Sequence, residues 1–206
     1  MDENSKMNEF LKVEYEKCID LLKFYDERHQ SLVKYASGIS AAVPSLLLSI
    51  YQIKGKAEEY FWDFSFIISL LAMFGLLSIF VTLVQTRLYF IYPTRQVNAI
   101  RKYSLEKLND EQFKNQMYLS TAFSAFKLRS TQTTLNLFIS MQVGSFAGLT
   151  LYIWMIMNNF QQNSVLMPVF FSILLVVILF CWSSYYLYKA SKYHPDSSIH
   201  REGNTQ

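Results

Sequence analysis

The strongest constraint on this chain is a long stretch without charge. From Ser130 to Tyr188 there is no Asp, Glu, Lys, Arg or His. A water-soluble fold needs charged side chains to solvate its surface and rarely avoids them for so long. A lipid-embedded helix must avoid them, because a charge near the bilayer centre costs about 2.5–3.5 kcal/mol. The sequence therefore predicts that most of this stretch lies in a membrane.

The apolar segments predict four transmembrane helices. Residues 35–53 lie between Lys34 and Lys54, and residues 61–84, 135–157 and 165–188 have similar lengths. A helix of about 20 residues crosses a hydrocarbon core about 30 Å thick. We therefore expect an all-α, polytopic membrane protein. Its expected divisions are an N-terminal amphipathic helix (1–34), transmembrane hairpin 1 (35–92), a helical insert (93–133), transmembrane hairpin 2 (134–189) and a disordered tail (190–206).

The N-terminal segment has the pattern of an amphipathic helix. Apolar and aromatic residues recur at alternating steps of four and three, as in a heptad repeat. This seam consists of Leu11, Tyr15, Cys18, Leu22, Tyr25, His29 and Leu32. The seam fits two interpretations, packing against the rest of the same chain or contact with a neighbouring subunit. Tyr, Cys and His are poor seam residues for a free-standing coiled coil, which favours packing within the chain.

The insert between the two hairpins is the main hydrophilic block. The helix of the second span is expected to end at Tyr92, because the residue before a proline disfavours helical geometry. After Pro93, one amphipathic helix is indicated by Val97, Ile100, Leu105 and Leu108. A break with an N-cap at Asn109-Asp110 would then begin a second helix at Glu111. Its apolar contacts would come from Phe113, Met117, Phe123 and Phe126.

The basic residues predict an orientation. Of the 19 lysine and arginine residues, all except Lys54 and Lys56 lie before residue 35, between residues 87 and 129, or after residue 188. Positive charge is retained on the cytoplasmic side of membranes. Both termini and the insert are therefore expected in the cytoplasm, with little protein on the far side.

Groups able to perform catalysis are sparse. The three histidines are His29, on the N-terminal seam, and His194 and His200, in the tail, and no nucleotide, hydrolase or metalloprotease motif is present. We expect neither an enzyme, nor a cofactor, nor a metal site, nor a DNA partner. The interiors of the spans lack ionisable residues, so a small transporter is a less favoured alternative. A pore would need several copies of the chain.

Two groups of residues are candidates for contacts. Small residues that permit close helix approach occur at Gly38 and Ala42 in the first span and at Gly144 and Gly148 in the third. The glycine pair fits contact within the chain as well as contact between subunits. A basic collar beside the second span could bind anionic lipid headgroups or a cytoplasmic partner. It consists of Arg87, Arg95, Arg101 and Lys102.

The layout of a charged N-terminal helix, two hairpins and a helical insert without catalytic residues resembles a class of small bacterial membrane proteins. These are the membrane accessory proteins of RNA-targeting CRISPR loci and the transmembrane effectors of nucleotide-signalling defence. The composition is also similar to that of AT-rich bacteria. The resemblance implies an oligomer in the bacterial inner membrane that disturbs the membrane when a cytoplasmic sensor signals. A membrane-anchored subunit that docks a cytoplasmic partner through residues 93–133 is the alternative.

Overall fold

The computed structural model describes residues 3–53, 58–108, 119, 124–160 and 165–192. These residues form four α-helices, α1 (Glu3–Ile53), α2 (Glu58–Leu108), α3 (Thr131–Met157) and α4 (Leu166–Ala190). Within the described residues there is no β-strand. Each helix contains a window long and apolar enough to cross a membrane, so the expected all-α fold with four candidate spans is confirmed.

The first two helices are longer than the sequence pattern predicts. The N-terminal amphipathic segment and the first span form one helix of 51 residues, with Pro44 inside it. The expectation that the second helix ends before Pro93 is wrong, because α2 continues through this proline to Leu108. A proline removes one backbone hydrogen bond. Contacts to α1 hold α2 on both sides of it: Tyr25 stacks on Tyr89, and Arg101 donates to the Tyr15 hydroxyl.

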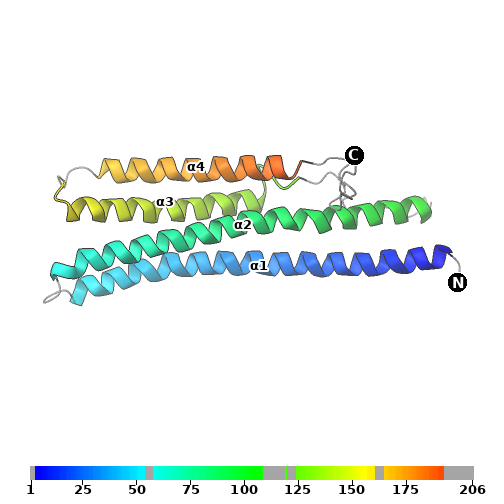
Figure 1. The fold of residues 1–206 in the computed structure, drawn as a ribbon, viewed down its shortest axis with the longest axis horizontal. Helices are drawn as coiled ribbons and strands as arrows, with labels where there is room; N and C mark the ends of the chain where they lie inside the picture. Colours follow the sequence, from blue (N-terminus) through cyan, green and yellow to red (C-terminus); the bar gives the residue numbers. More distant parts are fainter. Residues whose placement is uncertain (1–2, 54–57, 109–118, 120–123, 161–164, 193–206) are drawn as a thin grey trace, which may run out of the picture.

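The four helices pack as an open row in chain order. Among the described residues, α1 packs mainly on α2, α2 also on α3, and α3 on α4, whereas α1 and α4 do not meet. Figure 1 shows this order from α1 to α4 across the molecule. The end of α1 and the start of α2 lie at the same end of the molecule as the end of α3 and the start of α4 (Figure 1). Each outermost helix therefore keeps much of its circumference uncovered.

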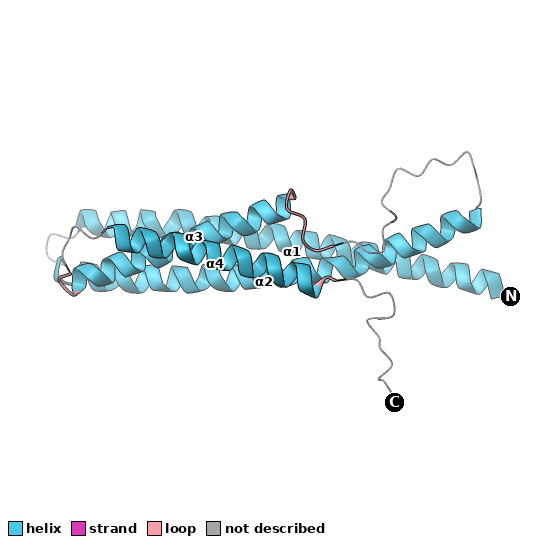
Figure 2. Cartoon of the chain, turned by 90° about the horizontal axis from the view of Figure 1, so that it is seen from above, coloured by secondary structure: helices cyan, strands magenta, loops and turns pink. Residues whose placement is uncertain are grey.

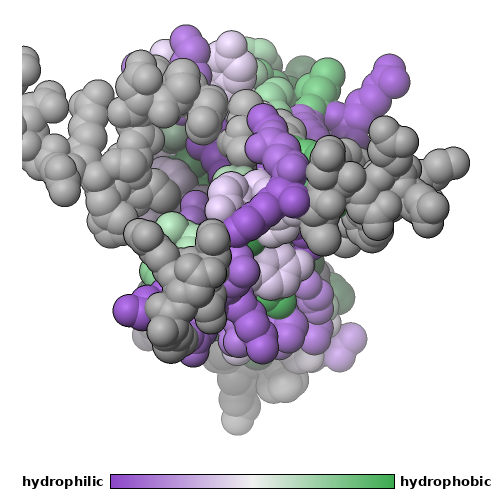
Figure 3. Space-filling view, turned by 90° about the vertical axis from the view of Figure 1, so that its right-hand side faces the viewer, coloured by the Kyte–Doolittle hydropathy of each residue, from purple (hydrophilic) through white to green (hydrophobic). Residues whose placement is uncertain are grey.

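Parts of α1 and α2 extend well beyond α3 and α4 (Figures 1 and 2). We call residues 3–34 of α1 and 93–108 of α2 the stalk. Hydrophilic side chains gather over this end of the molecule (Figure 3). The charged residues of α1 lie in the stalk, and the uncharged residues 35–53 lie beside the apolar part of α2.

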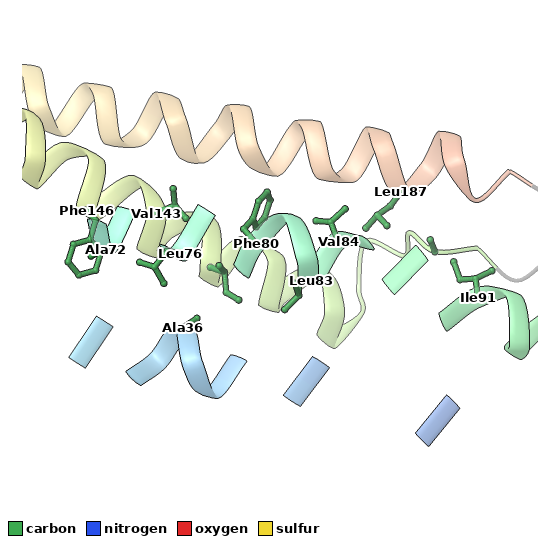
Figure 4. Close-up of a cluster of buried hydrophobic side chains, with 12 residues drawn as sticks. Ala36, Ala72, Leu76, Phe80, Leu83, Val84, Ile91, Val143, Phe146 and Leu187 are labelled. Atoms are coloured by element: carbon green, nitrogen blue, oxygen red, sulfur yellow. The ribbon is translucent and has the colours of Figure 1, made fainter. Parts of the chain in front are cut away.

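The core lies where α1, α2 and α3 meet, with Leu187 added from α4 (Figure 4). Phe80, Leu76 and Leu83 of α2 are fully buried there. Two buried hydroxyls of α3 are satisfied within their own helix: Ser140 donates to the Asn136 carbonyl at 2.7 Å and Thr150 to the Phe146 carbonyl at 2.8 Å. The buried hydroxyls of Ser65 and Ser69 in α2 have no hydrogen-bond partner among the described residues. The outer face of α4 is apolar and exposed, as lipid contact requires, with Leu166, Phe170, Ile173 and Val177 on it.

Several sequence-based expectations fall outside the described residues. They are the break at Asn109-Asp110, the second insert helix from Glu111 with Phe113, Met117 and Phe123, and the tail beyond Lys192. Phe126, the last apolar residue expected in that helix, is described: it lies in the non-helical segment 124–130 and packs against the core.

Candidate functional site

A polar site lies where α3 begins, between α1 and α2. A cavity of about 50 Å³ opens there. It lies next to the apolar segments rather than inside them, after Val84 of α2 and before Lys34 of α1. The residues around it, which we call the polar junction, are Tyr25, Asp26, His29, Thr86, Arg87, Phe90 and Gln132. The volume and the lining are suited to a few water molecules or one small ion.

His29 connects α1 to the first turn of α3. The Gln132 side-chain amide nitrogen lies 3.0 Å from His29 Nδ1. An amide nitrogen donates, so Nδ1 accepts and a neutral imidazole carries its proton on Nε2. Nε2 is buried and has no hydrogen-bond partner among the described residues. The ring therefore directs an N–H donor into the interior of the junction.

Arg87 supplies the positive charge of the junction. Its Nε donates to the Ala125 carbonyl at 3.3 Å, and its guanidinium lies 5.3 Å from the centre of the Phe90 ring. Burial lowers the pKa of Arg87, which remains a cation because arginine does not deprotonate in proteins. Arg87 thus connects α2 to the segment that leads into α3.

The pKa of His29 is lowered. Burial is the main cause, Arg87 adds to the effect, and Asp26 opposes it. His29 lies a few residues before the uncharged segment 35–53, and Arg87 directly follows the uncharged segment 64–86. Both therefore lie at the edge of the membrane-spanning part. A second positive charge beside Arg87 is therefore unfavourable, and protonation of Nδ1 also removes the acceptor for Gln132.

We expect the folded protein to lose stability as the pH falls from 8 to 5, in part through His29. Its ordinary pKa is 6.5 and the folded value is lower. The unfolded chain therefore binds the proton first, and stability that is complete above this pH is lost below it. Unfolding of the purified protein by denaturing detergent at several pH values measures the effect. The variant His29→Asn should show a smaller pH dependence, and an unchanged pH dependence would contradict this role.

The arginines of the basic collar contact their own chain. Arg95 donates to the Ser191 carbonyl, and the Ser191 hydroxyl accepts from the Ala125 N–H at 3.1 Å. Arg101 lies 3.1 Å from the Tyr15 hydroxyl. Lys102 differs, because it is exposed and, among the described residues, pairs with Glu106 of its own helix at 3.8 Å. These contacts favour a role for the three arginines in joining helices rather than in docking a partner.

The N-terminal seam faces α2. Cys18 is buried, and the other members are partly covered along the α1–α2 contact: Leu11, Tyr15, Leu22, Tyr25, His29 and Leu32. Among the described residues, the seam therefore forms a contact within the chain, which was one of its two interpretations.

The two pairs of small residues have different surroundings. A Cβ added at Gly144 or Gly148 would meet the Ser172 carbonyl at 2.8 Å or the Pro168 carbonyl at 2.9 Å, so α3 and α4 touch at this pair. Gly38 and Ala42 are exposed, and a Cβ at Gly38 meets nothing within 4 Å. The third-span pair is used inside the chain, whereas the first-span pair remains uncovered by it.

Several residues of the junction carry no signal in the sequence. Thr86, Phe90 and Gln132 belong to no motif, and only the folded chain brings them together. The sequence carries one indirect signal for Gln132, its place in the first turn of α3. Ser130 caps this helix by accepting from the Thr133 N–H at 3.3 Å. In the part of the chain that the structure describes, no three His, Cys, Asp or Glu residues are grouped to hold a metal ion.

Comparison with protein-family models, with curated proteins and with solved structures finds no match for this chain.

Proposed function

We propose that this chain is a non-enzymatic integral membrane protein that self-associates and, once assembled, disturbs the permeability of its membrane. The observation that carries the proposal is the open row. Within the described residues, the outermost helices α1 and α4 do not meet, and α1 leaves Gly38 and Ala42 uncovered. Small residues on an uncovered face are suited to close contact with another helix in lipid.

Permeation through this chain would require several copies. Four helices that pack in a row enclose no channel, and the cavity at the polar junction has a volume of only about 50 Å³. Side chains on the membrane part of α1 are uncharged from Tyr35 to Ile53. Copies that surround a channel with such helices would line it with serine hydroxyls and small apolar groups.

The location is part of the proposal. The stalk forms one end of the molecule, and α4 ends on the side that faces it (Figure 1). Most of the lysines and arginines belong to the stalk, the end of α4 and the insert. The positive-inside rule then supports cytoplasmic termini. The resemblance to defence-associated proteins supports the bacterial inner membrane as the location and a signal from infection as the trigger.

The test is dye release from liposomes. Purified protein reconstituted at increasing protein-to-lipid ratios should release a small trapped dye more steeply than linearly, because several copies act together. The variant Gly38→Leu should reduce release at least about fivefold, since a large side chain at this position fits the monomer but blocks close approach. Ser37→Leu, at the adjacent exposed position, is the matched control and should release dye as the wild type does.

No dye release by the wild-type protein at any ratio would remove the permeability part of the proposal. The alternative of a docking subunit has less support, because the collar arginines contact their own chain. The transporter alternative has less support because the interiors of the spans offer no ionisable group to couple to an ion, Asp63 lying at the very start of the second span.

A further inference from the structure

A second heptad set runs along α1, one position before each residue of the seam. It follows alternating steps of three and four residues from Met7 to Ser49, and we call it the outer stripe. Adjacent residues on a helix point about 100° apart. The seam faces α2, and the start of α3 contacts α1 through Gln132 and His29, which also belongs to the seam. The outer stripe therefore lies on a flank of α1 that neither α2 nor the start of α3 covers.

In the stalk, the outer stripe exposes large apolar side chains. Phe10 is 61% exposed and Phe24 is 53% exposed, and Met7 and Leu21 are exposed between and beside them. Charged residues surround them, so this part of α1 belongs in water. Apolar surface left in water costs about 25 cal/mol per Å², and a contiguous exposed patch usually marks a contact.

In the membrane part, the same stripe consists mainly of small residues. A Cβ at Gly38 would meet nothing within 4 Å. The Ser45 and Ser49 hydroxyls donate to carbonyls of their own helix at 2.9 Å, so they carry no unsatisfied donor into lipid. A second helix can therefore approach α1 closely over this length.

The outer stripe runs without a break from water into lipid, winding slowly round α1 because a 3.5-residue repeat drifts about 20° per heptad. This continuity restricts what can cover it. Lipid can cover only the membrane part, and a soluble protein only the stalk. A second copy of the chain has a helix that crosses the same boundary at the same residues. We infer that the outer stripe is the contact between two copies of this chain, with the two α1 helices parallel about a two-fold axis along the membrane normal.

Opposite charges accompany the charged residues of the stripe in this arrangement. In a parallel heptad contact, a side chain at the register of Glu14 or Arg28 packs between four residues of the other helix, which lie four before, one before, at and three after its own position. Glu14 then meets both Glu14 and Lys17 of the other copy, and Arg28 meets both Arg28 and Glu27. The two-fold axis thus places Glu14 beside Glu14 and Arg28 beside Arg28, and each of these like-charged pairs is flanked by two residues of opposite charge.

The inference rests on the proposed self-association and specifies its contact. The first test is disulfide cross-linking in native membranes. In a background with Cys18→Ala and Cys181→Ala, the variant Ser45→Cys should form a cross-linked dimer at least about tenfold more than Ser37→Cys. Both are exposed serines in the membrane part of α1, and only Ser45 lies on the stripe. Equal yields from the two variants would overturn the inference.

The second test reverses charges. Glu14→Lys should lower the fraction of dimers in nanodiscs at least about fivefold, because two lysine side chains then face each other across the contact. The double variant Glu14→Lys with Lys17→Glu restores opposite charges and should restore the dimer. A double variant that stays as monomeric as the single variant would contradict the pairing.

The mass of the wild-type particle separates the two proposals. An oligomer in which Ser45→Cys does not cross-link would show that the chain self-associates through another face. The outer-stripe contact would then be wrong, and the proposed self-association would stand. A monomer at every protein density would remove both the stripe contact and the self-association. Far-ultraviolet circular dichroism of each variant confirms that the helices are retained.

Discussion

Replacement of Gly144 and Gly148 together by alanine is expected to destabilise the folded protein by about 3 kcal/mol or more, the sum of two overpacked sites. The reason is steric. Each new Cβ would lie within 3 Å of a backbone carbonyl of α4, that of Ser172 or Pro168. A backbone carbonyl cannot rotate away as a side chain can, so α3 and α4 must separate. The better helix propensity of alanine, about 1 kcal/mol per residue, offsets only part of this cost.

The glycine prediction is measured by unfolding in detergent micelles. Gly75→Ala is the matched control, because its Cβ would meet only the end of the Ile39 side chain at an ordinary 3.7 Å. The control should be at least as stable as the wild type. A double variant as stable as the control would show that α3 and α4 do not pack closely at this pair.

The second large effect is expected at Phe80. Phe80→Ala should destabilise the protein by about 3–5 kcal/mol, because the ring is fully buried among three helices and its loss leaves a cavity. Phe74→Ala is the matched control on the same helix, since Phe74 is 55% exposed. Its ring faces lipid, which fills the space left by a smaller side chain. The control should cost less than about 1 kcal/mol.

The comparison of these two phenylalanines tests the core and the membrane interpretation together. Unfolding of both variants is measured in the same micelles. Equal destabilisation would mean that protein, not lipid, covers Phe74. The exposed face assigned to α2 at this position would then be wrong. A small effect at both positions would contradict the core around Phe80.

The four spans could be predicted because a single physical rule, the cost of charge in lipid, acts on every residue of a span independently. The lengths of α1 and α2 could not be predicted in the same way. Local rules end a helix before Pro93, but Tyr25 and Tyr15 of α1 hold α2 on both sides of it. Packing between distant segments exceeded the local cost of one missing hydrogen bond.

Local sequence patterns also do not predict which element a given helix face packs against. The N-terminal seam gave the periodicity of a contact but not its partner, which is α2 in the structure. The glycine pair of α3 predicts that another helix packs closely on it, but the sequence pattern does not identify that helix. In the structure it is α4. The polar junction could not be predicted from the sequence, because His29, Arg87 and Gln132 are far apart in the chain and no local pattern links them. Arg87 belonged to the predicted basic collar and His29 to the predicted seam, but neither pattern indicated that the two residues meet.

The unbroken course of α1 has a mechanical consequence. A helix of 51 residues measures about 77 Å and resists bending far more than a jointed chain does. His29 holds it at the junction near its middle. Because α1 contacts α2 from Tyr15 in the stalk to Tyr51 near its C-terminal end, the two helices must move together as one rigid pair. A displacement of the stalk is therefore carried directly into the apolar part of both helices.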